Sequence, residues 1–153
     1  EAAVPFAEAM TLSVRNLELP YAVFEVELLP VAIGPNGRDS VQFRFSATGR
    51  NAVDVAKCAS GGEMSRIMLA FKNIISSYDM IPTLIFDEID AGISGKTAWK
   101  VAEKLGKLGG AHQVICITHL AQIAAMADAH YAIEKNVTDG KTKTSISLLN
   151  AIT

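Results

Sequence analysis

The chain has 153 residues, of which 50% are hydrophobic and 20% are charged, and its formal net charge is -2. These values describe one globular domain or a large part of one, and they carry no overall basic signal for nucleic acid. No apolar run approaches the ~20 residues that a membrane span requires, so we expect no membrane partner. Cys58 and Cys116 are too few for a disulfide scaffold, and we expect a cytoplasmic protein.

The first third of the chain predicts a helix followed by a pair of strands. Residues 2–19 have one apolar helical stripe, which consists of Phe6, Met10, Val14 and Leu17. Because the chain begins with Glu1, inside this helix, we expect it to be a fragment of a longer protein. Alternating apolar residues at 21–29 and 41–45 predict two half-buried strands that pair antiparallel across a turn at 35–37.

The segment Ala59-Ser-Gly-Gly-Glu-Met-Ser-Arg66 begins a helix of about four turns. Ser60 and Glu63 fit an S-x-x-E capping box, which explains both residues by structure alone. A capping box does not explain Gly61 and Gly62, because each glycine in a first turn is less favourable than alanine by up to ~1 kcal/mol. Both glycines are explained if an anion approaches the backbone N–H groups, with the Ser60 hydroxyl as a further donor. The pattern therefore favours a phosphate contact at this helix start.

The run Thr83-Leu-Ile-Phe86 is unbroken and apolar, and it predicts a strand buried on both faces of a parallel sheet. Two carboxylates, Asp87 and Glu88, follow this strand directly. Ligands of open α/β sheets bind at the carboxyl ends of the strands, where these acids stand. Asp87 is a candidate Mg²⁺ ligand, and Glu88 is a candidate to orient or deprotonate a water molecule. The structural alternative is that both acids cap the next loop.

The segment Asp90-Ala-Gly-Ile-Ser-Gly-Lys-Thr97 imitates a phosphate-binding loop, because Gly95-Lys96-Thr97 matches the end of G-x-x-x-x-G-K-[ST]. The first glycine of that pattern should stand at position 90, which is Asp90, and the neighbouring acids would repel a polyphosphate. We therefore interpret Ser94 as the cap of a helix that ends at Gly109-Gly110. Its buried stripe is expected to consist of Ala98, Val101, Ala102, Leu105 and Leu108.

Residues 113–118 predict a second buried strand, which leads into His119. A strand, a helix and another strand form a βαβ unit, so the two strands should be parallel, with their carboxyl ends at one edge. This arrangement places His119 beside Asp87 and Glu88 and favours a functional role for it. A short helix follows, and then an antiparallel hairpin with strands at 129–134 and 142–149.

Together these motifs resemble the second half of an ATP-binding-cassette ATPase head, with its signature motif, Walker B strand, D-loop and switch histidine. Within that superfamily the chain is most similar to the RecN family of SMC-like bacterial DNA repair ATPases. The resemblance covers residues 20–149, and its most specific segments are 59–70, 86–95 and 118–125. The chain departs from the family at Ala121, where proline is usual, and in the loop 47–50.

The resemblance implies an α/β fold, namely the C-terminal lobe of an ABC/SMC-type ATPase head, with parallel core strands, flanking helices and antiparallel hairpins. It implies that residues 1–19 are the end of a returning coiled-coil helix and that residues 20–153 form the C-terminal lobe. The N-terminal lobe, which carries the Walker A motif in this family, is expected outside this chain. The fragment alone should therefore be inactive.

By the same resemblance Asp87 would hold Mg²⁺, Glu88 would be the general base, and His119 would contact the γ-phosphate of ATP. Asp90 would lie in the D-loop at a dimer interface. The signature residues would contact, in trans, the ATP bound to a second head, and they are Ser60, Gly61, Gly62 and Glu63. The implied partners are the protein's own N-terminal lobe, a second head in an ATP-dependent homodimer, and DNA in the full-length protein, at a nucleoid-associated location.

Three other functions stay open on the sequence. The chain could be a head fragment of another SMC-like cassette ATPase. It could be a stand-alone P-loop NTPase or kinase that uses Gly95-Lys96-Thr97. It could also be a non-catalytic interaction module, in which the acids after the first buried strand are only structural.

Overall fold

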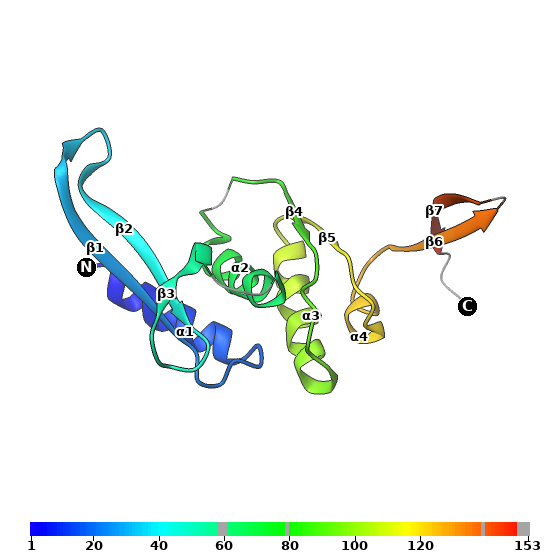
Figure 1. Ribbon diagram of the computed structural model, residues 1–153, viewed down its shortest axis with the longest axis horizontal. Coiled ribbons are helices and arrows are strands. Elements are labelled where there is room, and N and C mark those ends of the chain that lie inside the picture. The colour runs from blue at the N-terminus through cyan, green and yellow to red at the C-terminus, as the bar shows by residue number, and fades with distance from the viewer. Residues whose placement is uncertain (58–60, 79, 139, 150–153) are drawn as a thin grey trace.

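The computed structural model describes residues 1–57, 61–78, 80–138 and 140–149. Its helices are α1 (Ala3–Arg15), α2 (Gly61–Ile75), α3 (Gly95–Gly109) and α4 (Ala121–Ala124), with a 3₁₀ turn η1 at Val55–Lys57. Its strands are β1 (Val23–Gly34), β2 (Gly37–Ser46), β3 (Val53–Asp54), β4 (Thr83–Phe86), β5 (Gln113–Cys116), β6 (His130–Thr138) and β7 (Lys141–Leu149). Figure 1 shows these elements following one another along the long axis, from β1–β2 to β6–β7. Within these ranges no helix combines the length and the apolarity needed to cross a bilayer.

Helix α1 packs against β1 and α2 and buries its predicted stripe. The fully buried members of this stripe are Met10, Val14 and Leu17. The helix ends at Arg15 rather than at residue 19, and the chain then turns at Glu18, whose φ of 66° is left-handed. Strands β1 and β2 pair antiparallel around the turn between Gly34 and Gly37, as the sequence predicted.

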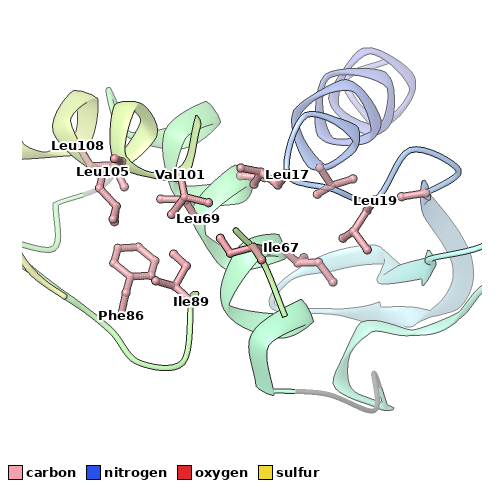
Figure 2. Packing of buried hydrophobic residues seen from close by; sticks show 14 of the residues in the cluster. Leu17, Leu19, Ile67, Leu69, Phe86, Ile89, Val101, Leu105 and Leu108 are labelled. Carbon is pink, nitrogen blue, oxygen red and sulfur yellow. The ribbon is translucent and has the colours of Figure 1, made fainter. Parts of the chain in front are cut away.

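The main core lies between α1, α2, α3 and β4. Figure 2 shows Ile67 and Leu69 of α2 beside Leu17 on one side and beside Val101 of α3 on the other. Helix α3 buries the stripe that the sequence predicted, namely Ala98, Val101, Ala102, Leu105 and Leu108. Ser94 holds the cap position with an extended backbone, although its side chain makes no capping hydrogen bond.

Strands β4 and β5 pair in parallel, in register from Thr83 with Gln113 to Phe86 with Cys116, which confirms the predicted βαβ unit. The prediction that β4 is buried on both faces is wrong for this chain. Phe86 is buried, but Ile85, on the opposite face of the strand, is 66% exposed. The described residues cover one face of the pair only, and its other face presents three exposed side chains, Ile85, Ile115 and Ile117.

Strands β6 and β7 form the predicted antiparallel hairpin, which projects beyond α4 (Figure 1). Asp139, which stands between these strands in the sequence, lies outside the described residues. One face of the hairpin carries five exposed apolar side chains beside Lys135 and Thr144, and they are Tyr131, Ile133, Val137, Ile146 and Leu148. An isolated two-stranded hairpin is only marginally stable in water unless other protein covers its apolar face.

Replacement of Leu69 by alanine tests the core between the helices. Leu69 is fully buried, so Leu69→Ala should lower the free energy of unfolding by about 2–5 kcal/mol, measured by urea denaturation of the 153-residue chain. Leu12→Ala is the matched control, because Leu12 is also helical but 64% exposed, and it should change stability by less than ~0.5 kcal/mol. Equal losses in the two variants would contradict this packing.

Candidate functional site

The carboxyl ends of β4 and β5 lie at one edge of the parallel pair. Phe86 pairs with Cys116, and the Ile117 backbone N–H donates to the Phe86 carbonyl oxygen at 2.9 Å. Burial, followed by the charges of Asp90 and Asp87, raises the pKa of the Cys116 thiol to about 11. The acids after β4 and the residues after β5 therefore share this edge, as the βαβ unit requires.

The N-terminus of α2 packs directly on the loop that follows β4. A Cβ atom built on Gly62 would lie 2.8 Å from the Ala91 Cβ and 3.2 Å from the carbonyl oxygens of Ala91 and Glu88. A Cβ atom on Gly61 would overlap the Glu88 carboxylate oxygen Oε2. Close contact with the chain's own loop thus accounts for Gly62, a reason that the sequence did not reveal, whereas the atom that Gly61 meets is the end of a flexible side chain.

Two side chains of α2 bind the backbone of the same loop. The Ser65 hydroxyl donates to the Asp87 carbonyl oxygen at 2.7 Å, and Arg66 Nη1 donates to the Ala91 carbonyl oxygen at 2.8 Å. Arg66 is only 7% exposed, and this burial lowers the pKa of its guanidinium. The sequence analysis missed Arg66, although its position one helical turn after Gly62 places it on the buried face of α2.

Asp87 and Glu88 are both exposed. The Glu88 backbone N–H donates to Asp87 Oδ1 at 2.9 Å. Glu88 has a φ of 56°, a left-handed conformation that is unfavourable by about 1–3 kcal/mol for a residue other than glycine and that concentrates at functional sites. Its carboxylate lies at the start of α2, where the helix dipole favours negative charge.

Asp87 fits a magnesium site only as one ligand among several. Within the described ranges no three His, Cys, Asp or Glu side chains cluster closely enough to hold a metal ion. Mg²⁺ is commonly bound by one or two carboxylates together with water and the phosphates of a substrate. The exposed carboxylate of Asp87 suits that arrangement, in which a phosphate completes the coordination.

Asp90 links the loop after β4 to the end of β5. It is 3% exposed, and its Oδ2 accepts hydrogen bonds from the Thr118 hydroxyl at 2.5 Å and from the His119 backbone N–H at 2.8 Å. The His119 ring nitrogen Nδ1 lies 3.1 Å from the same oxygen. The acid that His119 contacts is therefore Asp90, whereas Glu88 lies against the start of α2. Thr118 is a further site residue that the sequence analysis did not assign.

The remaining predicted site residues stand at or just before the starts of α2 and α3 in the sequence. Ser60 lies outside the described residues, so its capping and phosphate contacts stay predictions. Glu63 stands in the first turn of α2. Gly95-Lys96-Thr97 forms the first turn of α3, where Thr97 is only 8% exposed. This burial argues against a phosphate loop there.

Two grooves flank these elements. A groove of about 220 Å³ lies between α2 and β4, with Ser65 and Phe86 in its lining. A larger one, of about 590 Å³, lies between α1 and β1 and is lined by none of the candidate site residues. The candidate site is thus an open edge of the molecule rather than a closed cavity, which suits a surface that a second component completes.

The chain is similar to curated DNA repair proteins. It is 46% identical over 137 residues to the DNA repair protein RecN of Bacillus subtilis, covering 89% of this chain and 23% of that protein. It is 56% identical over 113 residues to RecN of Treponema pallidum, covering 73% of this chain and 20% of that protein. The chain therefore spans about a quarter or less of the length of these relatives. No protein-family model matches it.

Solved SMC heads share its fold. The Smc head domain of Pyrococcus yayanosii, with a coiled coil and joint, aligns with a TM-score of 0.60 at 22% identity, over 92% of this chain and 26% of that one. A second structure comes from work on the ATP-driven dimerization and DNA-stimulated activation of SMC ATPases. It aligns with a TM-score of 0.52 at 21% identity, over 95% of this chain and 83% of that one. Both confirm the lobe of an SMC-type head as the fold.

Replacement of Gly62 tests the contact between α2 and the loop after β4. Gly62→Ala should lower the free energy of unfolding by about 1–3 kcal/mol, because its Cβ would press against Ala91 and the Glu88 carbonyl oxygen. Gly106→Ala is the matched control, since a Cβ there meets only Met126 Cε at 3.9 Å, and it should stabilise α3 by up to ~1 kcal/mol. Differential scanning calorimetry of both variants measures the difference, and a neutral Gly62→Ala would refute the close contact.

Proposed function

The chain is similar to RecN proteins over most of its length and has the fold of an SMC-type head lobe, and from this premise we propose that it is the C-terminal part of a RecN-like ATPase head. In the full-length protein it would support ATP hydrolysis in DNA double-strand-break repair and recombination. The observation that carries this proposal is the packing of the glycine-rich start of α2 on the loop that bears Asp87 and Glu88. That packing joins an anion-binding helix start to two carboxylates.

The proposed chemistry is transfer of the γ-phosphoryl group of ATP to water. Glu88 would act as general base or would position the water, and its exposed carboxylate is accessible to one. Asp87 would ligate Mg²⁺, which when bound neutralises charge on the phosphates. His119 would contact the γ-phosphate at the end of β5, on the same edge of the sheet.

The signature residues are proposed to act on a second head. Gly61 is exposed at the start of α2, so its backbone can meet a phosphate presented by another molecule. Such a contact in trans would make the homodimer depend on ATP, and Asp90 would stand in the loop that borders this interface. The SMC ATPases compared above undergo ATP-driven dimerization and DNA-stimulated activation, according to the description of that structure. We propose both properties for the full-length RecN-like protein.

The exposed face of the β4–β5 pair is evidence that another lobe packs on this chain. Ile85, Ile115 and Ile117 are 66%, 44% and 47% exposed, although the surrounding sequence has the pattern of a strand buried on both faces. We propose that the N-terminal lobe with the Walker A motif covers this face, and that residues 1–19 are the end of a returning coiled-coil helix. The remaining cradle of the nucleotide would then come from that lobe.

Of the alternatives, the head of another SMC-like ATPase is the nearest, because the same fold serves both. The identity of 46% to RecN, against 22% to the Smc head, favours the RecN-like assignment. A stand-alone P-loop NTPase is disfavoured by the burial of Thr97. A non-catalytic module is disfavoured by the left-handed conformation of Glu88, which a capping role does not require.

Hydrolysis assays test the proposed function. The 153-residue chain alone should not hydrolyse ATP, whereas a Bacillus subtilis RecN in which this chain replaces the matching segment should do so. In that chimera Glu88→Gln should lower kcat by about 10²–10⁴-fold while ATP binding persists, because only proton transfer or water positioning is lost. Glu25→Gln, which removes an exposed carboxylate on β1, should leave kcat unchanged. Activity that survives Glu88→Gln would refute the role given to Glu88.

Association with the missing lobe provides a second test. Ile85→Lys should leave the unfolding of the isolated chain nearly unchanged, because Ile85 is already 66% exposed. The same variant should prevent association with a separately expressed N-terminal lobe of Bacillus subtilis RecN, since an unpaired charge would be buried. Size-exclusion chromatography measures the complex, with Ile33→Lys at the far end of β1 as the control. Equal association of wild type and Ile85→Lys would exclude this face as the docking surface.

A further inference from the structure

Helix α3 carries a row of lysines on the side opposite its buried stripe, which we call the lysine face. Lys96, Lys100, Lys104 and Lys107 follow one another at intervals of three or four residues, so all four lie on one side of the helix. Lys104 is partly buried, and the other three are exposed. Glu103 is the only acid in the sequence of α3, so this helix is basic within a chain whose formal net charge is -2.

No carboxylate forms an ion pair with the lysine face. Among the residues that the structure describes, no Asp or Glu side chain lies within ion-pair distance of any of the four lysines. Lys104 Nζ instead donates to the Ser13 hydroxyl of α1 at 2.9 Å. Burial, followed by repulsion from Lys107, lowers the pKa of Lys104, although Glu103 opposes this change. The lysine face is therefore a row of like charges that an external anion would stabilise.

The lysine face points away from the surface on which the N-terminal lobe is proposed to dock. Figure 2 shows Phe86 of β4 beside Leu105 of α3, so α3 covers the face of the β4–β5 pair that holds Phe86. The exposed side chains of Ile85, Ile115 and Ile117 lie on the other face. Because the lysines stand on the far side of α3 from its buried stripe, the two surfaces lie on opposite sides of the lobe. A partner can therefore reach the lysine face while the head is complete.

Trp99 borders the lysine face and is the only tryptophan of the chain. It stands one helical turn after Lys96 and is 52% exposed, although its neighbour Ala98 is fully buried. Surfaces that bind nucleic acid without sequence preference combine basic groups that follow the backbone with aromatic side chains on which bases stack. The exposed indole and the lysines together supply both features.

We propose that the lysine face binds the phosphate backbone of DNA, with Lys96, Lys100 and Lys107 as the phosphate contacts and Trp99 as a stacking platform for an unpaired base. The proposal rests on the proposed function, and it names the surface of this lobe that meets the DNA partner. The lysines extend over about 16 Å of helix axis, along which duplex DNA presents one phosphate about every 1.7 Å. Contacts from lysine to phosphate do not depend on the base sequence.

Other polyanionic partners fit the lysine face less well. A helix that lies on a membrane presents a wide apolar face to the lipid, but the apolar stripe of α3 is buried in the core. Centres of protein interfaces are depleted of lysine and contain several apolar anchors, whereas Trp99 is the only exposed large hydrophobic side chain within α3. The observations therefore favour DNA over a lipid surface or an acidic protein.

Fluorescence anisotropy of labelled DNA with the 153-residue chain tests the lysine face. Lys96→Gln/Lys100→Gln/Lys107→Gln should weaken binding by about tenfold or more. It should also reduce the slope of log Kobs against log salt by about 2–3 between about 50 and 200 mM salt, because three phosphate contacts are lost. Lys96→Arg/Lys100→Arg/Lys107→Arg keeps the charge and should retain the affinity.

The matched control removes the same charge from the exposed β6–β7 hairpin, by Lys135→Gln/Lys141→Gln/Lys143→Gln. This variant should change the affinity and the salt slope much less. Equal weakening by the two triple glutamine variants would overturn the proposal, since net charge alone predicts that result.

The emission of Trp99 provides a second readout in the wild-type chain. Because the chain has no other tryptophan, DNA bound at the lysine face should quench or shift the emission. Bound DNA that leaves the emission unchanged would overturn the proposal, even if the lysine variants did not fold. Trp99→Ala should weaken binding of a single strand by about 5–100-fold and binding of a blunt duplex less, because only the single strand offers unpaired bases. Equal weakening of both would overturn the stacking role.

Competition identifies the class of partner. Unlabelled DNA should displace the labelled DNA, whereas phosphatidylglycerol vesicles and polyglutamate at the same concentration of charge should not. Equal displacement by either competitor would overturn DNA as the partner.

Failure of the proposal and failure of the proposed function have different signatures. If the Bacillus subtilis RecN chimera with the wild-type chain does not hydrolyse ATP, the proposed function fails, while anisotropy and Trp99 emission still decide whether the lysine face binds DNA. If DNA stimulates the chimera equally with and without Lys96→Gln/Lys100→Gln/Lys107→Gln, the ATPase assignment stands and the role of the lysine face is wrong.

Discussion

The site depends on the contact between the start of α2 and the loop that follows β4. The helix can approach this far only because position 62 has no Cβ, since Ala91 and the Glu88 carbonyl oxygen fill the space that a side chain would need. Ser65 and Arg66 then bind carbonyl oxygens of the same loop. The start of α2 and the loop that bears both carboxylates are therefore joined by one close packing contact and two hydrogen bonds.

A second junction connects this unit to the end of β5. Burying a carboxylate is unfavourable unless donors surround it, and Asp90 Oδ2 accepts two hydrogen bonds, from the Thr118 hydroxyl and the His119 backbone N–H. Because one of these donors is the His119 backbone N–H, the loop after β4 is joined directly to the segment that follows β5. The residues proposed as the general base, the metal ligand and the γ-phosphate contact thus stand on segments that share hydrogen bonds. None of these segments is placed independently of the others.

The same chain leaves two apolar surfaces open. One is the face of the β4–β5 pair with Ile85, Ile115 and Ile117, and the other is the face of the β6–β7 hairpin. Apolar strand faces that the described residues leave uncovered favour association with further protein. An open edge with acids at its rim and an uncovered sheet face beside it fits the proposal that a further lobe completes the site.

The sequence by itself determined the local elements and the order of the motifs. The stripe of α3, the antiparallel pairing of β1 with β2 and the parallel pairing of β4 with β5 follow from periodicity and turn residues, which act over a few positions. Only the tertiary structure decided that Gly62 meets Ala91, that Arg66 is buried, and that His119 binds Asp90 rather than the acids directly after β4. It also decided that Ile85 is exposed, although its pattern predicts burial. These contacts join residues that are 25 or more positions apart, as in the bond from Arg66 to Ala91, and they depend on the path of the loops, which periodicity does not encode.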